Sequence, residues 1–448
     1  MEGINLLYLG IVVLSWFLPS MLLLSFCIPW LMMLSWGGYI PPLLSIGSAE
    51  IQIFDLVLVM LWIRYLVFIF LHKVRIKTHY VHFVVIMFLM ILLLMTMVSF
   101  FRFGQEVFID EVIAFARFIS QISILFLVSW IVKTPGYAYK MGQYLEWFGF
   151  SLALGVYLNM FGIKVGEVQI TERTVRYFGF AGDQLGFILP LFIFNSLLER
   201  SPLRLLYYSV ALLATVTRGP LLTIAVGIAV LAWKAKERWG VRKRLGGWRV
   251  GTAVLLGLIG LWLVADIGGI AKRFTGLELE LGLTQRLLTS KIALEVFLDN
   301  LLTGVGYTGF RYAAFEYGAF NIFEERIGFS PNFIATAGSQ WLQVATDGGL
   351  LALLYFAWMI VALLQTLRVA ADHMEEHGRT IYLSGYAWLV ALVLGNWTAA
   401  WMLPGSLISY LLWLICGSAV AIELTIVQKL SLGKGLGYQA KIQYAEKA

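Results

Sequence analysis

Apolar runs of about 20 residues recur along most of this chain, and they constrain its fold more than any other feature. Each is long enough to cross a bilayer as a helix. The chain is 60% hydrophobic and 13% charged, with a mean hydropathy of +0.83, whereas about 25% of an average soluble protein is charged. The alternation typical of transmembrane strands is missing. We therefore predict an all-α polytopic membrane protein.

The runs predict about 12 transmembrane helices in one membrane domain that occupies residues 1–448. The first run could also form two short helices, because Pro19 and Pro29 interrupt it. The predicted spans are 5–35, 51–71, 81–100, 112–132, 144–163, 184–198, 202–216, 219–233, 250–268, 341–367, 381–397 and 406–427.

The distribution of Lys and Arg predicts the orientation of these spans. Twenty of them lie in one set of alternate loops and the C-terminal tail, against five in the opposite short loops. Loops rich in Lys and Arg stay in the cytoplasm. We therefore predict that both termini are cytoplasmic and that the long segment 269–340 is an external, periplasmic loop. The protein would be a multi-pass protein of the bacterial inner membrane.

Other features argue against several kinds of partner. The net charge of +7 does not indicate nucleic-acid binding, because most basic residues flank spans. Cys27 and Cys416 lie inside apolar runs and are predicted to be packing residues rather than a disulfide or metal pair. All five histidines fall on the predicted cytoplasmic side. We therefore predict no metal site and no other cofactor.

Several arginines lie at the predicted external face, against the charge bias: Arg173, Arg176, Arg218 and Arg286. A single such arginine could reach lipid headgroups or pair with a nearby acid. Arginine is also the residue that binds phosphate through two parallel hydrogen bonds, and these strengthen at a desolvated membrane edge. The group therefore makes a phosphate-binding external face a competing interpretation. Arg64 and Arg117 lie inside apolar runs, and we predict structural roles for both.

The external segment predicts a helix over 284–300 followed by a turn with the sequence GVGYTGF. Thr284 is its predicted N-cap, which would place Arg286 in the first turn, where free N–H groups favour an anion. Two apolar rows predict that this helix lies against the membrane domain: Leu288, Ile292 and Val296, and Leu287, Leu294 and Leu298. Asp347 lies two turns inside a later span and is predicted to be buried and paired.

Over about residues 165–365 these motifs together resemble the bacterial O-antigen ligase and polymerase superfamily. Its members are integral-membrane glycosyltransferases that act on undecaprenyl-diphosphate glycans. The motifs that carry the resemblance are Arg176 in RYFGFAGD, Thr217-Arg218-Gly219, Arg286 with the later GVGYTGF, and WLQVATDGGLLALL at 341–354. The resemblance implies a glycosyltransferase-C-like fold and an inverting, metal-independent reaction.

The chain departs from the ligases of this family at one position. They carry a histidine a few residues before the Trp-Leu pair, as the proposed base, and the corresponding residue here is Gly338. The resemblance therefore favours a polymerase of O-antigen or exopolysaccharide type. Arg176 and Arg286 would bind the diphosphate leaving group, with Arg218 and Arg173 supporting them. The acceptor hydroxyl still needs a base, and the sequence does not select among Glu324, Glu325 and Glu295.

The implied donor is an undecaprenyl-diphosphate-linked glycan, and the implied acceptor is a lipid-linked repeat unit. Membrane lipid surrounds the protein, and the resemblance leaves room for a chain-length regulator protein as a partner. An O-antigen ligase that transfers glycan to a lipid A core is the first alternative. A polysaccharide flippase is the second, but a transporter predicts repeats between the two halves, and the charges here gather at one face instead.

Overall fold

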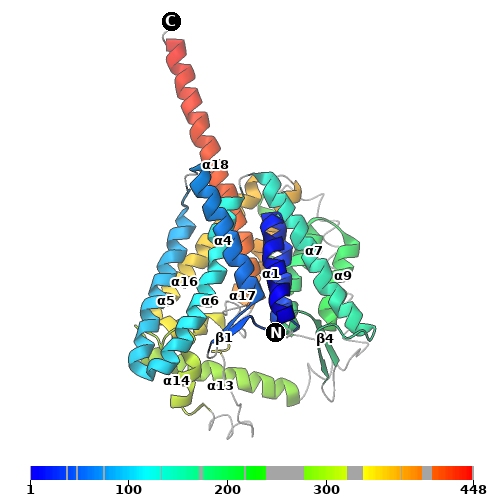
Figure 1. Cartoon of the computed structure of the whole chain (residues 1–448), viewed down its shortest axis with the longest axis vertical. Coiled ribbons are helices and arrows are strands. Elements are labelled where there is room, and N and C mark those ends of the chain that lie inside the picture. Colours follow the sequence, from blue (N-terminus) through cyan, green and yellow to red (C-terminus); the bar gives the residue numbers. More distant parts are fainter. Residues whose placement is uncertain are drawn as a thin grey trace.

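The computed structural model describes residues 2–36, 39–46, 49–73, 76–132, 134–170, 175–215, 218–238, 277–319, 336–374, 376–395 and 406–445. Helices dominate these residues (Figure 1). They are α1 (Glu2–Phe17), α2 (Ser20–Leu22), the π-helix η1 (Leu23–Cys27), α3 (Ile28–Trp36), α4 (Ile53–His72), α5 (Tyr80–Phe103), α6 (Gln105–Ile131), α7 (Pro135–Met160), the 3-10 helix η2 (Gly182–Gln184), α8 (Leu185–Leu198), α9 (Pro202–Ala214), α10 (Arg218–Arg238), α13 (Leu277–Asp299), α14 (Phe310–Glu316), α16 (Gln340–His373), α17 (Glu376–Gly395) and α18 (Leu407–Ala445).

Two short antiparallel hairpins add to the helices. β1 (Leu44–Ile46) pairs with β2 (Ala49–Ile51), and β3 (Glu167–Ile170) pairs with β4 (Val175–Gly179). The second hairpin ends at Gly179, which has a φ of 61°, and Gly182 follows with a φ of 55°. The left-handed region is open to glycine at little cost, so the tight turn predicted before α8 is confirmed. The hairpins lie outside the long helices, and the all-α prediction for the membrane domain is confirmed.

Five helical segments in the described part of the chain are long and apolar enough to cross a membrane: 53–72, 80–103, 107–131, 340–373 and 407–427. Five shorter apolar helices accompany them: 20–35, 185–198, 202–214, 219–234 and 378–394. The break predicted between α9 and α10 is present, and Pro220 lies in the first turn of α10 as expected. The predicted span at 250–268 falls outside the described residues. The polytopic membrane fold is thus confirmed, and the number of twelve spans stays a prediction.

The first apolar run forms two helical segments rather than one span. Tyr8 of α1 donates its hydroxyl hydrogen to the carbonyl oxygen of Pro41, which follows α3, so the two segments run in opposite directions. Arg64 of α4 donates to the carbonyl oxygen of Leu18 at 2.7 Å, beside the turn between them. This is the structural role predicted for Arg64, because it satisfies a carbonyl that a helix end leaves free.

This arrangement bears on where the chain begins. The N-terminus lies at the end of the molecule where β1, β4 and α13 are found, and the C-terminal end of α18 lies at the opposite end (Figure 1). The arrangement therefore does not support the prediction that both termini are cytoplasmic, and the side of the membrane on which each terminus lies stays a prediction.

The core is built around α18, whose segment from Leu407 to Ile422 is almost entirely buried. It packs against α6 and α16, and Tyr410 donates to the carbonyl oxygen of Leu24 at 2.7 Å. The helix α13 has a different direction. It lies across one end of the bundle, crosswise to α5 and α6, with α14 beside it (Figure 1). We call this end of the molecule the α13 end.

Candidate functional site

The helix α13 begins earlier than the sequence predicts. It starts at Leu277 rather than after Thr284, so Thr284 lies inside the helix and Arg286 lies in its third turn. The predicted first-turn position of Arg286 is wrong. The free N–H groups at the start of the helix therefore do not lie beside Arg286 to help bind an anion. The reason is that leucines and glutamates, which favour helices, precede Thr284, while a single glycine costs only about 1 kcal/mol.

The two apolar rows of α13 have different environments. Ile292 and Val296 are buried, and Leu288 packs against them, as predicted. The other row faces outward, because Leu287, Leu294 and Leu298 are 69%, 46% and 58% exposed. A helix with one face on the protein and a leucine row on the other fits a position at the surface of a membrane.

Arg286 lies between the two faces of α13. Its side chain is exposed, yet packing around the guanidinium lowers its pKa by desolvation. An arginine stays charged despite such a shift. Among the residues that the structure describes, Arg286 has no hydrogen-bond or ion-pair partner, whereas Lys291 on the same helix lies 3.8 Å from Glu295. Arg286 therefore presents a cation that is available to a ligand.

The turn before α16 meets α13 next to Arg286. A Cβ atom added at Gly338 would lie 3.6 Å from Ser290 Oγ and 3.7 Å from Thr289 Cγ2. Thr289 and Ser290 follow Arg286 by three and four residues, and side chains with this spacing are neighbours on one helix face. The structure thus places Gly338, where the family's ligases carry a histidine, about one helical turn from Arg286.

The glycine turn 304–309 and the Asp347-Gly348-Gly349 motif form one structural unit. The N–H groups of Val305 and Gly306 donate to the carbonyl oxygens of Thr346 and Asp347 at 2.8 and 2.9 Å. Leu350 N–H donates to the carbonyl oxygen of Leu301 at 2.7 Å. These bonds join the end of α13 to a kink in α16 at Gly349, which has a φ of 67° and a ψ of −166°. Only glycine adopts this conformation readily.

The Asp347 side chain holds this unit together from inside. It is 2% exposed, and both carboxylate oxygens accept from Gln343 Nε2 at 3.0 Å. The backbone N–H groups of Thr308 and Phe310 also donate to it. The prediction that Asp347 is buried and paired is confirmed. Because its hydrogen bonds are made within the protein, Asp347 positions the turn and does not face a substrate.

Glu111 of α6 packs against the other side of the same turn. Its carboxylate oxygens would contact Cβ atoms added at Gly306 and Gly309, so both positions require glycine. Glu111 is fully buried and its oxygens have no hydrogen-bond partner. Arg117, for which we predicted a structural role, lies in the electrostatic field of Asp55. The sequence analysis did not single out Glu111.

Two other arginines at the α13 end are held by the protein. Arg102 of α5 donates to Asn300 at 2.5 Å and to Glu316 at 2.6 Å, and Arg311 of α14 lies 3.4 Å from Asp110. Nearby, burial and the Asp299 carboxylate raise the pKa of the Tyr317 hydroxyl, which donates to that carboxylate at 2.7 Å. These contacts fix α13 and α14 on the bundle, and they give Arg102 and Arg311 partners of a kind that Arg286 lacks among the described residues.

Of the other predicted site residues, the structure describes some and not others. Arg176 lies on β4, where its backbone pairs with Gln169, and Arg218 is the first residue of α10. β4 lies at the α13 end (Figure 1). Arg173, Glu324 and Glu325 lie outside the described residues. In the part of the chain that the structure describes, no group of three or more His, Cys, Asp or Glu side chains could hold a metal.

The arrangement can bind an anion at the edge of a membrane. Arg286 supplies the charge, the hydroxyls of Thr289 and Ser290 lie one turn away, and exposed leucines occupy the outer side of α13. A ligand with a charged head and an apolar tail matches these three features, because each part meets its own surface.

Comparison with known proteins identifies the central segment of the chain. Residues 203–357 match the model of the O-antigen ligase family. This segment runs from α9 to the first half of α16, so it includes Arg218, Arg286, Gly338 and Asp347, while Arg173 and Arg176 precede it. The match supports the resemblance to the O-antigen ligase and polymerase superfamily. No curated protein matches the chain.

Proposed function

Since residues 203–357 match the model of the O-antigen ligase family, we propose that the protein is a membrane glycosyltransferase that lengthens a polysaccharide. Its donor is a glycan on undecaprenyl diphosphate, and its acceptor is a lipid-linked repeat unit. The bond between the sugar and the phosphate oxygen breaks, and an acceptor hydroxyl forms the new glycosidic bond. The reaction takes place at the α13 end, on the periplasmic side of the inner membrane.

One observation carries this proposal. Arg286 is a cation without a partner among the described residues, on a helix that crosses the end of the bundle and exposes leucines. A lipid diphosphate leaving group gains negative charge as the bond to the sugar breaks. A guanidinium placed beside it stabilises that charge more in the transition state than before it. In this proposal Arg286 speeds the reaction by neutralising the charge of the diphosphate leaving group, without forming a covalent bond to the substrate.

Arg176, Arg218 and Arg173 belong to the same proposal. In this proposal each of them adds a hydrogen bond to the diphosphate or to its sugar. The acceptor hydroxyl loses a proton as it attacks, and Glu324 or Glu325 is the proposed base. Glu295 is a poorer candidate, because its carboxylate already pairs with Lys291.

The test compares Arg286→Lys and Arg286→Ala at matched protein levels. Arginine offers a planar pair of donors that lysine lacks, so both variants should be slow. By analogy with a lost oxyanion donor, we expect a cost of about 3 kcal/mol, or about a hundredfold in rate. The measurement is transfer between purified lipid-linked repeats, followed by the chain length of the product.

Lys291→Ala is the matched control, because Lys291 is an exposed cation on the same helix. It should leave the rate within a factor of about two, since an exposed ion pair contributes little. Long chains from Arg286→Lys and Arg286→Ala at the normal rate would show that Arg286 only anchors α13 at the membrane, and the proposed function of this helix would then fail.

A ligase is the second candidate, because the matching family model describes O-antigen ligases. It would transfer a finished glycan to lipid A core rather than to a repeat unit. The residue at the expected histidine position is Gly338, which weighs against the ligase base. Cells that lack the protein distinguish the two: single repeats on lipid indicate a polymerase, and full-length chains on lipid indicate a ligase.

A further inference from the structure

The carboxyl group of Glu111 lies among acceptor oxygens. Its Oε1 atom lies 2.8 Å from the position that a Cβ atom at Gly309 would take. The carbonyl oxygens of Val305 and Gly306 lie 2.5 and 3.0 Å from the same position. Glu111 is fully buried, and neither carboxyl oxygen has a hydrogen-bond partner among the described residues. An ionised carboxylate can only accept hydrogen bonds, so it gains nothing from these neighbours.

The backbone donors of the glycine turn are all used elsewhere. Each N–H group from 305 to 310 already donates to another acceptor. The acceptors are the carbonyl oxygen of Thr346 for Val305, that of Asp347 for Gly306, Thr96 Oγ1 for Tyr307, the carbonyl oxygen of Gly306 for Gly309, and the Asp347 carboxylate for Thr308 and Phe310. The turn therefore has no N–H group left that could stabilise a negative charge on Glu111.

The neighbouring side chains do not supply a hydrogen either. The Ser99 hydroxyl of α5 faces the Glu111 carboxyl group, but it donates to the carbonyl oxygen of Thr96 at 2.8 Å. Ser99 Oγ can therefore only accept from Glu111. The Tyr307 hydroxyl and Arg311 Nε are buried without a hydrogen-bond partner of their own, so neither donates to it. In the part of the chain that the structure describes, Glu111 is thus a buried acid without a donor.

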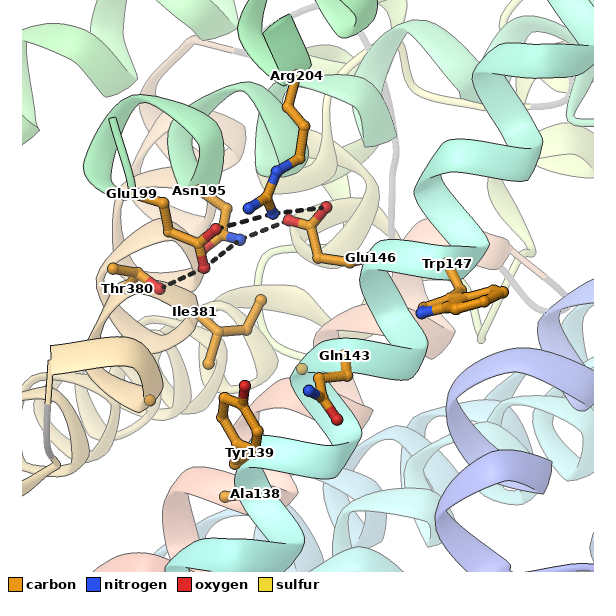
Figure 2. Close-up of a pocket in the computed structure, with 12 residues that line it drawn as sticks. Ala138, Tyr139, Gln143, Glu146, Trp147, Asn195, Glu199, Arg204, Thr380 and Ile381 are labelled. Atoms are coloured by element: carbon orange, nitrogen blue, oxygen red, sulfur yellow. Dashed lines mark hydrogen bonds and ion pairs between the residues drawn. The ribbon is translucent and has the colours of Figure 1, made fainter. Parts of the chain in front are cut away.

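The carboxylates around Arg204 have the opposite environment. Figure 2 shows Glu146 and Glu199 beside the Arg204 guanidinium, whose Nη1 lies 3.6 and 2.8 Å from one oxygen of each. The Asn195 amide also donates to both of them. An anion can be buried where such donors surround it. Because Glu111 lacks them, its surroundings favour the neutral acid.

We propose that Glu111 carries a proton in the folded protein and that this proton stabilises the turn 304–309. A protonated carboxyl group has one O–H donor, and it lies against the acceptor oxygens of Val305, Gly306 and Ser99. The turn joins the end of α13 to the kink of α16. Glu111 is therefore a positioning residue that holds α13 in place from inside the bundle. This inference does not depend on which reaction the protein catalyses.

Loss of this proton should open the turn. Two charged groups on other elements act on Glu111 with opposite signs, Asp347 of α16 and Arg311 of α14. Arg311 already lies 3.4 Å from Asp110, so its charge is shared. The folded protein holds a proton that a glutamate of the unfolded chain releases above about pH 4, so stability falls as the pH rises. The α13 end is therefore a pH-sensitive switch that alkaline conditions open.

Infrared spectroscopy of the full-length protein in detergent at neutral pH tests the proton directly. The C=O stretch of a protonated carboxyl group absorbs apart from the carboxylate bands. Isotope-labelled glutamate should shift one such band in the wild type, which assigns it to a glutamate without any substitution. Glu111→Gln and Glu111→Met should each remove this band. Asp110→Asn is the matched control and should leave it, because the Asp110 carboxylate accepts from Arg311 and Tyr312.

Melting temperatures from neutral to alkaline pH test the switch. The unfolding equilibrium constant of the wild type should rise by up to about tenfold for each pH unit through this proton. Glu111→Gln should lose that part of the pH dependence, because glutamine keeps an N–H donor and does not ionise, and Asp110→Asn should keep it. A wild type without a protonated glutamate band, or a band that survives in both Glu111 variants, would overturn the proposal. So would the same pH dependence in the wild type and in Glu111→Gln.

Discussion

Replacing Gly349 by alanine tests whether the kink of α16 is a structural requirement. The added Cβ would lie 2.7 Å from the carbonyl carbon and oxygen of Leu302, and 2.8 Å from the carbonyl oxygen of Leu301. Backbone atoms cannot rotate away as a side chain can, so the end of α13 or α16 must shift. That shift would break the 2.7 Å bond from Leu350 N–H to the Leu301 oxygen.

The expected cost has three parts. The φ of 67° is unfavourable for alanine by about 1–3 kcal/mol. Overpacking adds about 1–3 kcal/mol, and the lost hydrogen bond adds about 1 kcal/mol. Together they predict that Gly349→Ala lowers the free energy of unfolding by about 3–7 kcal/mol.

The matched control is Gly318→Ala. Gly318 has a φ of 63°, but a Cβ atom there would meet nothing within 4 Å. Its substitution should therefore cost only the backbone strain, about 1–2 kcal/mol. The assay heats the purified protein in detergent and follows tryptophan fluorescence together with the fraction that stays monodisperse. Equal losses of melting temperature for the two variants would refute the argument from close contact.

Two further predictions concern the same end of the molecule. Asp347→Leu should destabilise the protein by about 3 kcal/mol or more, because it leaves Gln343 and two backbone N–H groups buried without acceptors; an unchanged melting temperature would show that water replaces the carboxylate. In a cysteine-free background, Lys291→Cys should react with an impermeant thiol reagent on spheroplasts and Lys140→Cys should not. Both residues are exposed; Lys291 lies on α13, whereas Lys140 lies near the start of α7, in a segment that the charge bias assigns to the cytoplasm. The reverse pattern would invert the orientation.

The sequence by itself determined the class of the protein and most of its helices. Hydropathy depends on the composition of each run, and a run of about 20 apolar residues has few folded alternatives in lipid. Local chemistry also sufficed for the break before Arg218, the turn at Gly179 and the burial of Asp347. The family resemblance rested on the same short motifs, and the matching family model covers most of them.

Only the tertiary structure decided how distant segments meet. The local sequence does not predict that the turn at Gly306 and the kink at Gly349 are joined by hydrogen bonds, because that contact depends on the path of the chain between them. The side of the N-terminus depended on whether residues 2–36 cross the bundle once or twice. The role of each arginine also depended on its neighbours: Arg102 pairs with Glu316, whereas Arg286 has no partner among the described residues. The sequence shows which residues are charged, but only the fold shows which of them are paired and which are available to bind a ligand.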